Sequence, residues 1–233
     1  MSKTLNTSPI KGIIFDVDGL LLDTDKTYVK CFQEIVNEYL PKKKPVISEN
    51  ILANMMGRNL LQSVQLIIDE YSVPIEGQEF VDIVNQRVPP LLPNCNEKKG
   101  ALKLINYLHK NNIPSALASG DELPNTLVKL ENKPWKSYYP KNQIMTGDQV
   151  TKGKPDPEIF LKAAESIGIK PENCIVFEDA LMGVKAGISA GMHVVWVPEY
   201  HMELEELPKA TQILDSLAEF NPQLFGLPKF DEN

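Results

Sequence analysis

The stretch KGIIFDVDGLLLDT, residues 11–24, places two aspartates directly after a run of apolar residues. Ile13, Ile14 and Phe15 have the β-branched and aromatic character of a buried strand. Asp16 and Asp18 then stand one residue apart, where that strand must end, and further apolar residues follow. An isolated pair of this kind also fits a turn or a helix cap. Its meaning therefore depends on what the rest of the chain brings beside it.

Three other apolar runs have the character of buried strands: SALAS at 115–119, CIVFED at 174–179 and HVVWVPE at 193–199. Between them, apolar residues recur at helical spacing over 101–108 and again over 159–164. Strands that alternate with helices indicate a parallel sheet with helices on both faces. We therefore predict an α/β fold with a Rossmann-like parallel sheet as its core.

Residues 25–89 follow a different pattern. Apolar positions recur at helical spacing over 28–39 and 60–71, and a third helical stretch lies around 79–88. No convincing strand interrupts them, and the prolines in PPLLP at 89–93 prevent the last helix from continuing. We predict a helical cap domain at 25–89, inserted into a catalytic core formed by 1–24 and 90–233. The final segment, 220–233, is expected to pack as an irregular strap.

The overall composition excludes several classes of protein. The formal net charge of −7 disfavours a nucleic acid polymer as partner, because such proteins usually carry a basic face. No segment approaches the roughly 18 unbroken apolar residues of a membrane helix, and no signal peptide is apparent. Cys31, Cys95 and Cys174 are odd in number and widely spaced, which favours a reducing compartment. We expect a cytoplasmic monomer.

Ligands of an open parallel sheet bind beyond the carboxyl ends of its strands. In this sequence, acidic residues follow several of the predicted strands. Asp16 and Asp18 follow the first strand, Ser119 follows another, and Glu178 and Asp179 end a third. Two carboxylates about 4 Å apart repel by roughly 4 kcal/mol at an effective dielectric near 20. They therefore need a cation, and hard oxygen ligands without His or Cys select Mg²⁺. Since Mg²⁺ commonly holds substrate phosphate, the implied substrate is a small phosphate ester.

The same residues suggest a reaction. Asp16 is suited to attack phosphorus and form an aspartyl-phosphate. Asp18 can then protonate the leaving oxygen and later activate water. The transferring phosphoryl group needs positive charge and hydrogen-bond donors, which Lys154, the Ser119 hydroxyl and the backbone N–H groups around Gly120 can supply.

Four motifs occur in a fixed order: FDVDG at 15–19, ALASG at 116–120, GKPDP at 153–157 and FEDALMGVKAGISAGM at 177–192. Each alone is weak, but together they make the chain resemble the haloacid dehalogenase-like phosphohydrolases over nearly its whole length. The resemblance implies an aspartyl-phosphate mechanism and a mobile cap that closes over substrate. It also implies Mg²⁺ bound by the Asp16 carboxylate, the Asp18 backbone carbonyl and Asp179, with Glu178 helping directly or through water.

Stretches outside these motifs resemble one branch of the family, the pseudouridine-5′-phosphatases. They include GLLLDTD at 19–25 and ILDSLAEFNPQLFGLP at 213–228. This resemblance implies a Mg²⁺-dependent phosphomonoesterase acting on pseudouridine 5′-phosphate. The alternatives are a sugar-phosphate phosphatase, a phosphoglucomutase-like phosphoryl transferase and, from another class, a non-catalytic binding protein on the same fold.

Two positions depart from the family pattern. Asp121 stands where relatives usually have a small hydroxyl residue, so it either lies close to a bound dianion or caps the next helix. Ala180 stands where serine is common. Elsewhere, Arg58 either reaches the leaving group of the substrate or is solvated. Small residues recur at helical spacing and are expected to let their helix pack closely on the sheet: Gly183, Ala186, Gly187 and Ala190.

Overall fold

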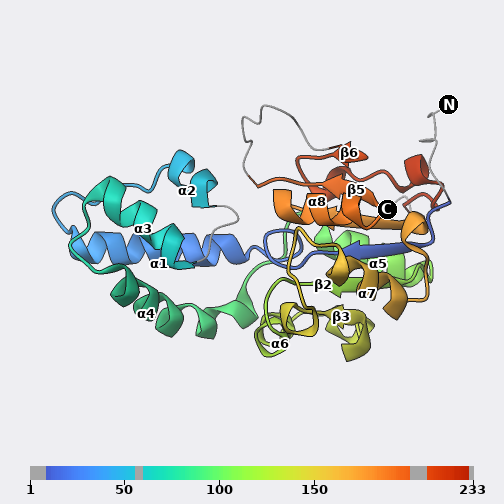
Figure 1. Ribbon diagram of the computed structural model, residues 1–233, viewed down its shortest axis with the longest axis horizontal. Coiled ribbons are helices and arrows are strands. Elements are labelled where there is room, and N and C mark those ends of the chain that lie inside the picture. Colours follow the sequence, from blue (N-terminus) through green and yellow to red (C-terminus); the bar gives the residue numbers. More distant parts are fainter. Residues whose placement is uncertain (1–8, 56–59, 200–208, 231–233) are drawn as a thin grey trace.

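The computed structural model describes residues 9–55, 60–199 and 209–230. Their core is a parallel sheet with the strand order β3-β2-β1-β4-β5-β6 (Figure 1). The strands are β1 Gly12–Phe15, β2 Ser115–Ala118, β3 Ile144–Met145, β4 Cys174–Glu178, β5 His193–Trp196 and β6 Gln212–Ile213. The predicted α/β fold with a parallel sheet is confirmed.

The path of the chain creates a switch point in the middle of the sheet. From β1 the chain adds β2 and β3 on one side, and it then crosses to the other side to add β4, β5 and β6. Connections therefore leave β1 and β4 in opposite directions, which opens a crevice at the carboxyl ends of these two strands.

Alternating residues of the strands enter two separate apolar layers. Ile13 and Phe15 of β1 pack on one face with α5 and with the C-terminal segment, whereas Ile14 packs on the other face with α7 and α8. Both faces are covered, which explains why these strands are continuous apolar runs. The helices around the sheet are α5 Ala101–Lys110, α6 Leu123–Leu130, α7 Glu158–Ser166 and α8 Leu181–Ser189.

A third apolar cluster holds together what we call the helical unit, made of α1–α4 and η1. Figure 1 shows these helices beyond the carboxyl end of β1. Phe32, Ile35, Val64 and Phe80 are at most 3% exposed at its centre. The elements are α1 Thr24–Tyr39, α2 Glu49–Met55, α3 Leu60–Tyr71, α4 Gly77–Arg87 and the 3₁₀ helix η1 Pro89–Asn94. The domain limits at 24/25 and 89/90 stay a prediction.

The chain enters and leaves the helical unit at neighbouring points. Leu22 forms an antiparallel bridge with Glu97. The Asp23 N–H donates to the Asn96 carbonyl at 2.8 Å, and the Lys98 N–H donates to the Leu21 carbonyl at 2.9 Å. The two connections therefore lie side by side.

Several elements differ from the sequence-based expectation. The four predicted strands are present, but β3 and β6 extend the sheet at its two edges, and α2 adds a helix to the helical unit. The C-terminal segment packs into the core as predicted, with Phe220, Phe225 and Leu227 buried. None of the described helices is long and apolar enough to span a membrane.

Candidate active site

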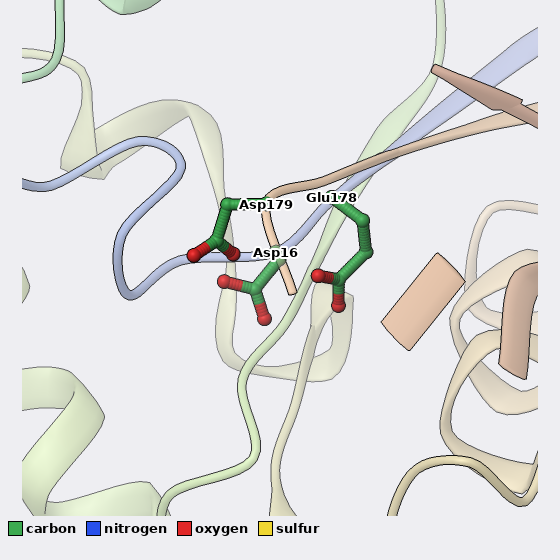
Figure 2. A group of neighbouring side chains, drawn as sticks. All are labelled: Asp16, Glu178 and Asp179. Atoms are coloured by element: carbon green, nitrogen blue, oxygen red, sulfur yellow. The ribbon is translucent and has the colours of Figure 1, made fainter. Parts of the chain in front are cut away.

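The register of the sheet brings acidic residues of β1 and β4 together. Phe15 is paired with Phe177, and the Asp16 N–H donates to the Phe177 carbonyl at 3.0 Å. Asp16 and Glu178 therefore leave adjacent strands at the same level, with Asp179 next in the chain. Figure 2 shows the three carboxyl groups converging.

Lys154 lies among these carboxylates. Its Nζ donates to Asp16 Oδ1 at 2.5 Å, to Glu178 Oε1 at 2.6 Å and to the carbonyl of Ala118, at the end of β2, at 3.2 Å. Burial alone lowers the pKa of Lys154, but the charges of Asp16 and Glu178 outweigh it and raise that pKa above its usual value. Lys154 is therefore a largely buried cation that is fixed by two acids, one following β1 and one ending β4.

The single positive charge of Lys154 does not balance the three acidic groups of Asp16, Glu178 and Asp179. Burial, opposed by the charge of Lys154 and reinforced by the charges of Glu178 and Asp18, raises the pKa of Asp16 to about 8. Burial also raises the pKa of Asp179 well above its usual range, with Glu178 and Asp16 adding to the effect. Within the described residues, the buried Asp16 Oδ2 has no hydrogen-bond partner.

The three carboxyl groups fit a divalent cation. Asp16, Glu178 and Asp179 each offer an oxygen, and these oxygens lie within 4.8 Å of one another. The unpartnered Asp16 Oδ2 adds a lone pair without a donor. An all-oxygen donor set of this kind suits Mg²⁺ better than Zn²⁺.

Glycines make room for two of these acids. A Cβ on Gly183 would lie 1.7 Å from Glu178 Oε1, so the helix α8 can pass the carboxylate only because residue 183 has no side chain. Gly19 has a φ of +81°, and a Cβ there would lie 2.3 Å from Asp179 Oδ2. Gly187 also meets the sheet as predicted, with its Cβ position 2.8 Å from Val194 Cγ2.

Asp18 belongs to a second group of polar side chains. The Ser119 hydroxyl donates to Asp18 Oδ2 at 3.1 Å, and Lys129 Nζ donates to Asp18 Oδ1 at 2.7 Å. Lys129 also donates to Asp121 Oδ2 at 2.8 Å. Asp121 thus faces a lysine, and its other oxygen accepts the N–H of Glu122 at the start of α6.

A cavity of about 450 Å³ separates the sheet from the helical unit. Asp16, Asp18 and Lys154 line its sheet side, together with Gly120. The opposite wall is largely apolar and comes from α1, α2 and α3: Tyr28, Val29, Phe32, Leu52, Met55 and Leu60, with the Ser63 hydroxyl among them.

The structure brings most of the predicted site residues together. Asp16, Glu178, Asp179 and Lys154 form one group, and Asp18 and Ser119 form the group beside it. Arg58 lies outside the described residues. Ala180 is at the N-cap of α8, and its N–H donates to Glu178 Oε2 at 3.0 Å, so its backbone fills a supporting role.

Two polar residues of this region were not predicted. Lys129 holds Asp18, as described above. Asp25, in the first turn of α1, lines the cavity, and burial together with the charge of Asp18 raises its pKa to about 6. Sequence reasoning missed Lys129 because a lysine on a helix is usually exposed to solvent.

Comparison with known proteins gives a consistent result. The model of the family described as "Haloacid dehalogenase-like hydrolase" matches residues 13–197. A protein of Drosophila melanogaster named "Probable pseudouridine-5'-phosphatase" is 34% identical, over 94% of this chain and 95% of its own. A protein of Arabidopsis thaliana named "(DL)-glycerol-3-phosphatase 2" is 33% identical, over 99% of this chain and 97% of its own.

The fold also matches a solved structure. A crystal structure of a HAD family hydrolase from Deinococcus radiodurans, with bound phosphate and sodium, superimposes with a TM-score of 0.76 at 23% identity. The match covers 93% of this chain and 95% of the other. At this identity the likeness concerns the fold.

Proposed function

The chain belongs to the haloacid dehalogenase-like hydrolases and is a phosphatase, and from this premise we propose that it is a Mg²⁺-dependent phosphomonoesterase that acts through an aspartyl-phosphate on Asp16. One observation carries the proposal. Asp16 is buried at the switch point of the sheet, with one oxygen held by Lys154 and the other without a partner among the described residues. That second oxygen is available to a phosphorus atom or a cation.

The residues around Asp16 have separate roles in this proposal. An Asp16 oxygen forms a bond to phosphorus as the bond from phosphorus to the leaving oxygen breaks, and Asp18 gives that oxygen its proton. Asp18 then takes a proton from water, the water oxygen attacks the phosphorus, and inorganic phosphate leaves Asp16 as a free carboxylate. Lys154, Ser119 and Gly120 stabilise the transferring group through charge and hydrogen bonds.

Asp16 and Asp179 are the residues that we expect to hold Mg²⁺ with their carboxylates, together with the backbone carbonyl of Asp18 and with Glu178 as a direct or indirect partner. The close approach of the three carboxyl oxygens supports this assignment. A bound Mg²⁺ supplies positive charge that offsets the charge of the transferring phosphoryl group.

We propose pseudouridine 5′-phosphate as the substrate. The Drosophila relative named for this activity supports the choice. The cavity supports it as well, because the apolar wall with Tyr28 and Phe32 suits a planar ring, while the phosphate would lie at the polar side near Lys154. Arg58 stays a predicted contact to the leaving group.

A glycerol or sugar phosphate is the second candidate. The Arabidopsis relative named as a glycerol-3-phosphatase is nearly as similar and covers slightly more of the chain. A polyol offers hydroxyl groups, for which the helical side of the cavity holds Asp25, the Tyr28 hydroxyl and Ser63 as polar partners among the described residues, beside a larger apolar surface. The ring-bearing substrate is therefore preferred.

Phosphate release from a panel of phosphomonoesters tests the proposal. The panel contains pseudouridine 5′-phosphate, UMP, glycerol 3-phosphate and hexose phosphates, each with Mg²⁺ and with a chelator. We expect the pseudouridine ester to have the highest kcat/KM and activity to require Mg²⁺. If UMP and hexose phosphates are hydrolysed equally well, the substrate assignment is wrong although the phosphatase assignment stands.

An Asp16→Asn variant tests the proposed nucleophile. It should lose activity by a factor of at least about 10³, because the nucleophile is removed. Full activity of this variant would refute the proposed nucleophile. A phosphosugar isomer formed without free phosphate would indicate a mutase instead.

We expect the active species to be a cytoplasmic monomer.

A further inference from the structure

Lys129 on α6 is a buried lysine with two acidic partners. Its side chain is 4% exposed, and its Nζ lies 2.7 Å from Asp18 Oδ1 and 2.8 Å from Asp121 Oδ2. Burial lowers the pKa of Lys129, but the charge of Asp18 and the hydrogen bond to Asp121 raise it above its usual value. A lysine is costly to bury without such pairing. Its place behind the cavity therefore calls for an explanation.

Asp121 anchors Lys129 from the side away from Asp18. Asp121 Oδ1 accepts the Glu122 N–H at 2.8 Å and the Asn125 side-chain amide at 3.0 Å. Both donors belong to the start of α6 and the residue before it. Asp121 is thus tied to the same helix that carries Lys129, and the ammonium group has a fixed position.

Asp18 is held through both of its oxygens. Lys129 donates to Oδ1, and the Ser119 hydroxyl donates to Oδ2. A carboxylate has about four lone-pair sites, so each oxygen keeps one for another partner. Asp18 lines the cavity, whereas Lys129 is not among the described residues that line it. Lys129 therefore touches Asp18 from behind and leaves its exposed side to the cavity.

We propose that Lys129 is a positioning residue that, itself fixed by Asp121, holds the Asp18 carboxylate in the orientation needed for proton transfer. The inference rests on the proposed role of Asp18 in the function above. Proton transfer requires the acid within hydrogen-bond reach of the leaving oxygen, and a displacement of about 1 Å can cost on the order of 100-fold in rate. The inference also explains why an acid stands at position 121.

Two substrates with different leaving groups test this role. The first is the alkyl phosphate that the parent hydrolyses fastest in the panel above, whose alkoxide needs a proton in order to leave. The second is p-nitrophenyl phosphate, whose nitrophenolate leaves without one. The parameter kcat/KM reports the steps up to release of the leaving group, so only the alkyl ester depends on Asp18 as an acid.

A Lys129→Met variant should lose about 10- to 100-fold in kcat/KM with the alkyl ester and less than about 3-fold with p-nitrophenyl phosphate. Lys162→Met is the matched control, because Lys162 pairs with Glu158 on the surface of α7 and its loss changes the net charge equally. The control should match the parent with both substrates. Equal losses with both substrates in Lys129→Met would overturn the inference.

A double variant adds an independent test. If Lys129 acts through Asp18, adding Lys129→Met to Asp18→Asn should lower kcat/KM for the alkyl ester by no more than about 2-fold, since the two effects are not independent. A full second loss would contradict the inference. A parent that hydrolyses neither substrate would instead refute the proposed function, so the two failures are distinguishable.

Asp121→Asn covers the case in which Lys129→Met does not fold. The amide oxygen can still accept the N–H of Glu122, but the anchor for Lys129 loses its charge. A smaller loss, again confined to the alkyl ester, is expected. A loss shared by both substrates, or no loss with either one, would overturn the inference.

Discussion

Replacing Gly183 by alanine should destabilise the protein, although alanine is the better helix former. Gly183 lies inside α8, where Gly→Ala on its own gains about 1 kcal/mol of helix stability. The added Cβ, however, would lie 1.7 Å from Oε1, 1.9 Å from Cδ and 2.5 Å from Oε2 of Glu178. Glu178 is fully buried, so its carboxylate has to leave its position.

The expected cost follows from the contacts that Glu178 would lose. Its Oε1 accepts from Lys154 at 2.6 Å, and its Oε2 accepts from the Ala180 N–H at 3.0 Å. Hydrogen bonds to charged groups contribute about 1.5–3 kcal/mol each. With the helix gain subtracted, the free energy of unfolding should fall by about 2–5 kcal/mol. For a chain of this size that corresponds to a Tm lower by about 4–20 °C.

Thermal and guanidinium unfolding, followed by circular dichroism in a chelator and without substrate, measure this effect. Gly187→Ala is the matched control, since Gly187 lies in the same helix and its replacement gives the same gain in helix propensity. Its added Cβ, however, would meet one methyl group of Val194 at 2.8 Å and no carboxylate. We expect a smaller loss there. A Gly183→Ala protein as stable as the parent would refute the reasoning, and equal losses in both variants would assign the effect to helix packing.

Three further changes give expectations of different sign and size. Without metal, Asp179→Asn should be at least as stable as the parent, because one of three mutually repelling carboxylates is gone. With Mg²⁺ at 100 times its Kd for the parent, the free energy of unfolding of the parent should rise by roughly 2.7 kcal/mol, and the variant should lack most of this gain. A variant that is less stable than the parent in chelator would contradict this. Trp196→Phe removes the donor to the Asp179 carbonyl at 2.7 Å and should cost about 1–3 kcal/mol in guanidinium unfolding, and an unchanged midpoint would argue against it. Arg87→Met breaks an exposed pair with Glu38 and should cost at most about 1 kcal/mol in the same assay; a larger loss would contradict the assignment of this pair to the surface.

The central strands could be predicted because their evidence is local. Strands buried on both faces must be apolar throughout, and β1, β2, β4 and β5 show this in the sequence. The edge strands β3 and β6 span two residues each, too few for any pattern. They are strands because a neighbour offers them a hydrogen-bonding edge, and that is a property of the assembled sheet.

The candidate site divides in the same way. Asp16, Asp18 and Lys154 could be proposed because motifs in a fixed order mark them. Lys129 lies outside these motifs, and a lysine on a helix is usually solvated. Lys129 is buried because it pairs with Asp18, a residue 111 positions away. Gly183 packs on the sheet as predicted, but the sequence does not show that it meets the Glu178 carboxylate at the end of β4 there. Spacing shows which residues share a helix face, and only the fold shows what they meet.

The paired connections at Leu22 and Glu97 bear on how such enzymes diversify. Because the chain leaves the sheet and returns at adjacent points, an insert of another length or sequence can replace the helical unit without rethreading a strand. Recombination or domain grafting at this position could therefore change which phosphate esters are admitted while the acids at the ends of β1 and β4 are inherited unchanged. The substrate range and the hydrolytic chemistry of such enzymes can therefore change independently in evolution.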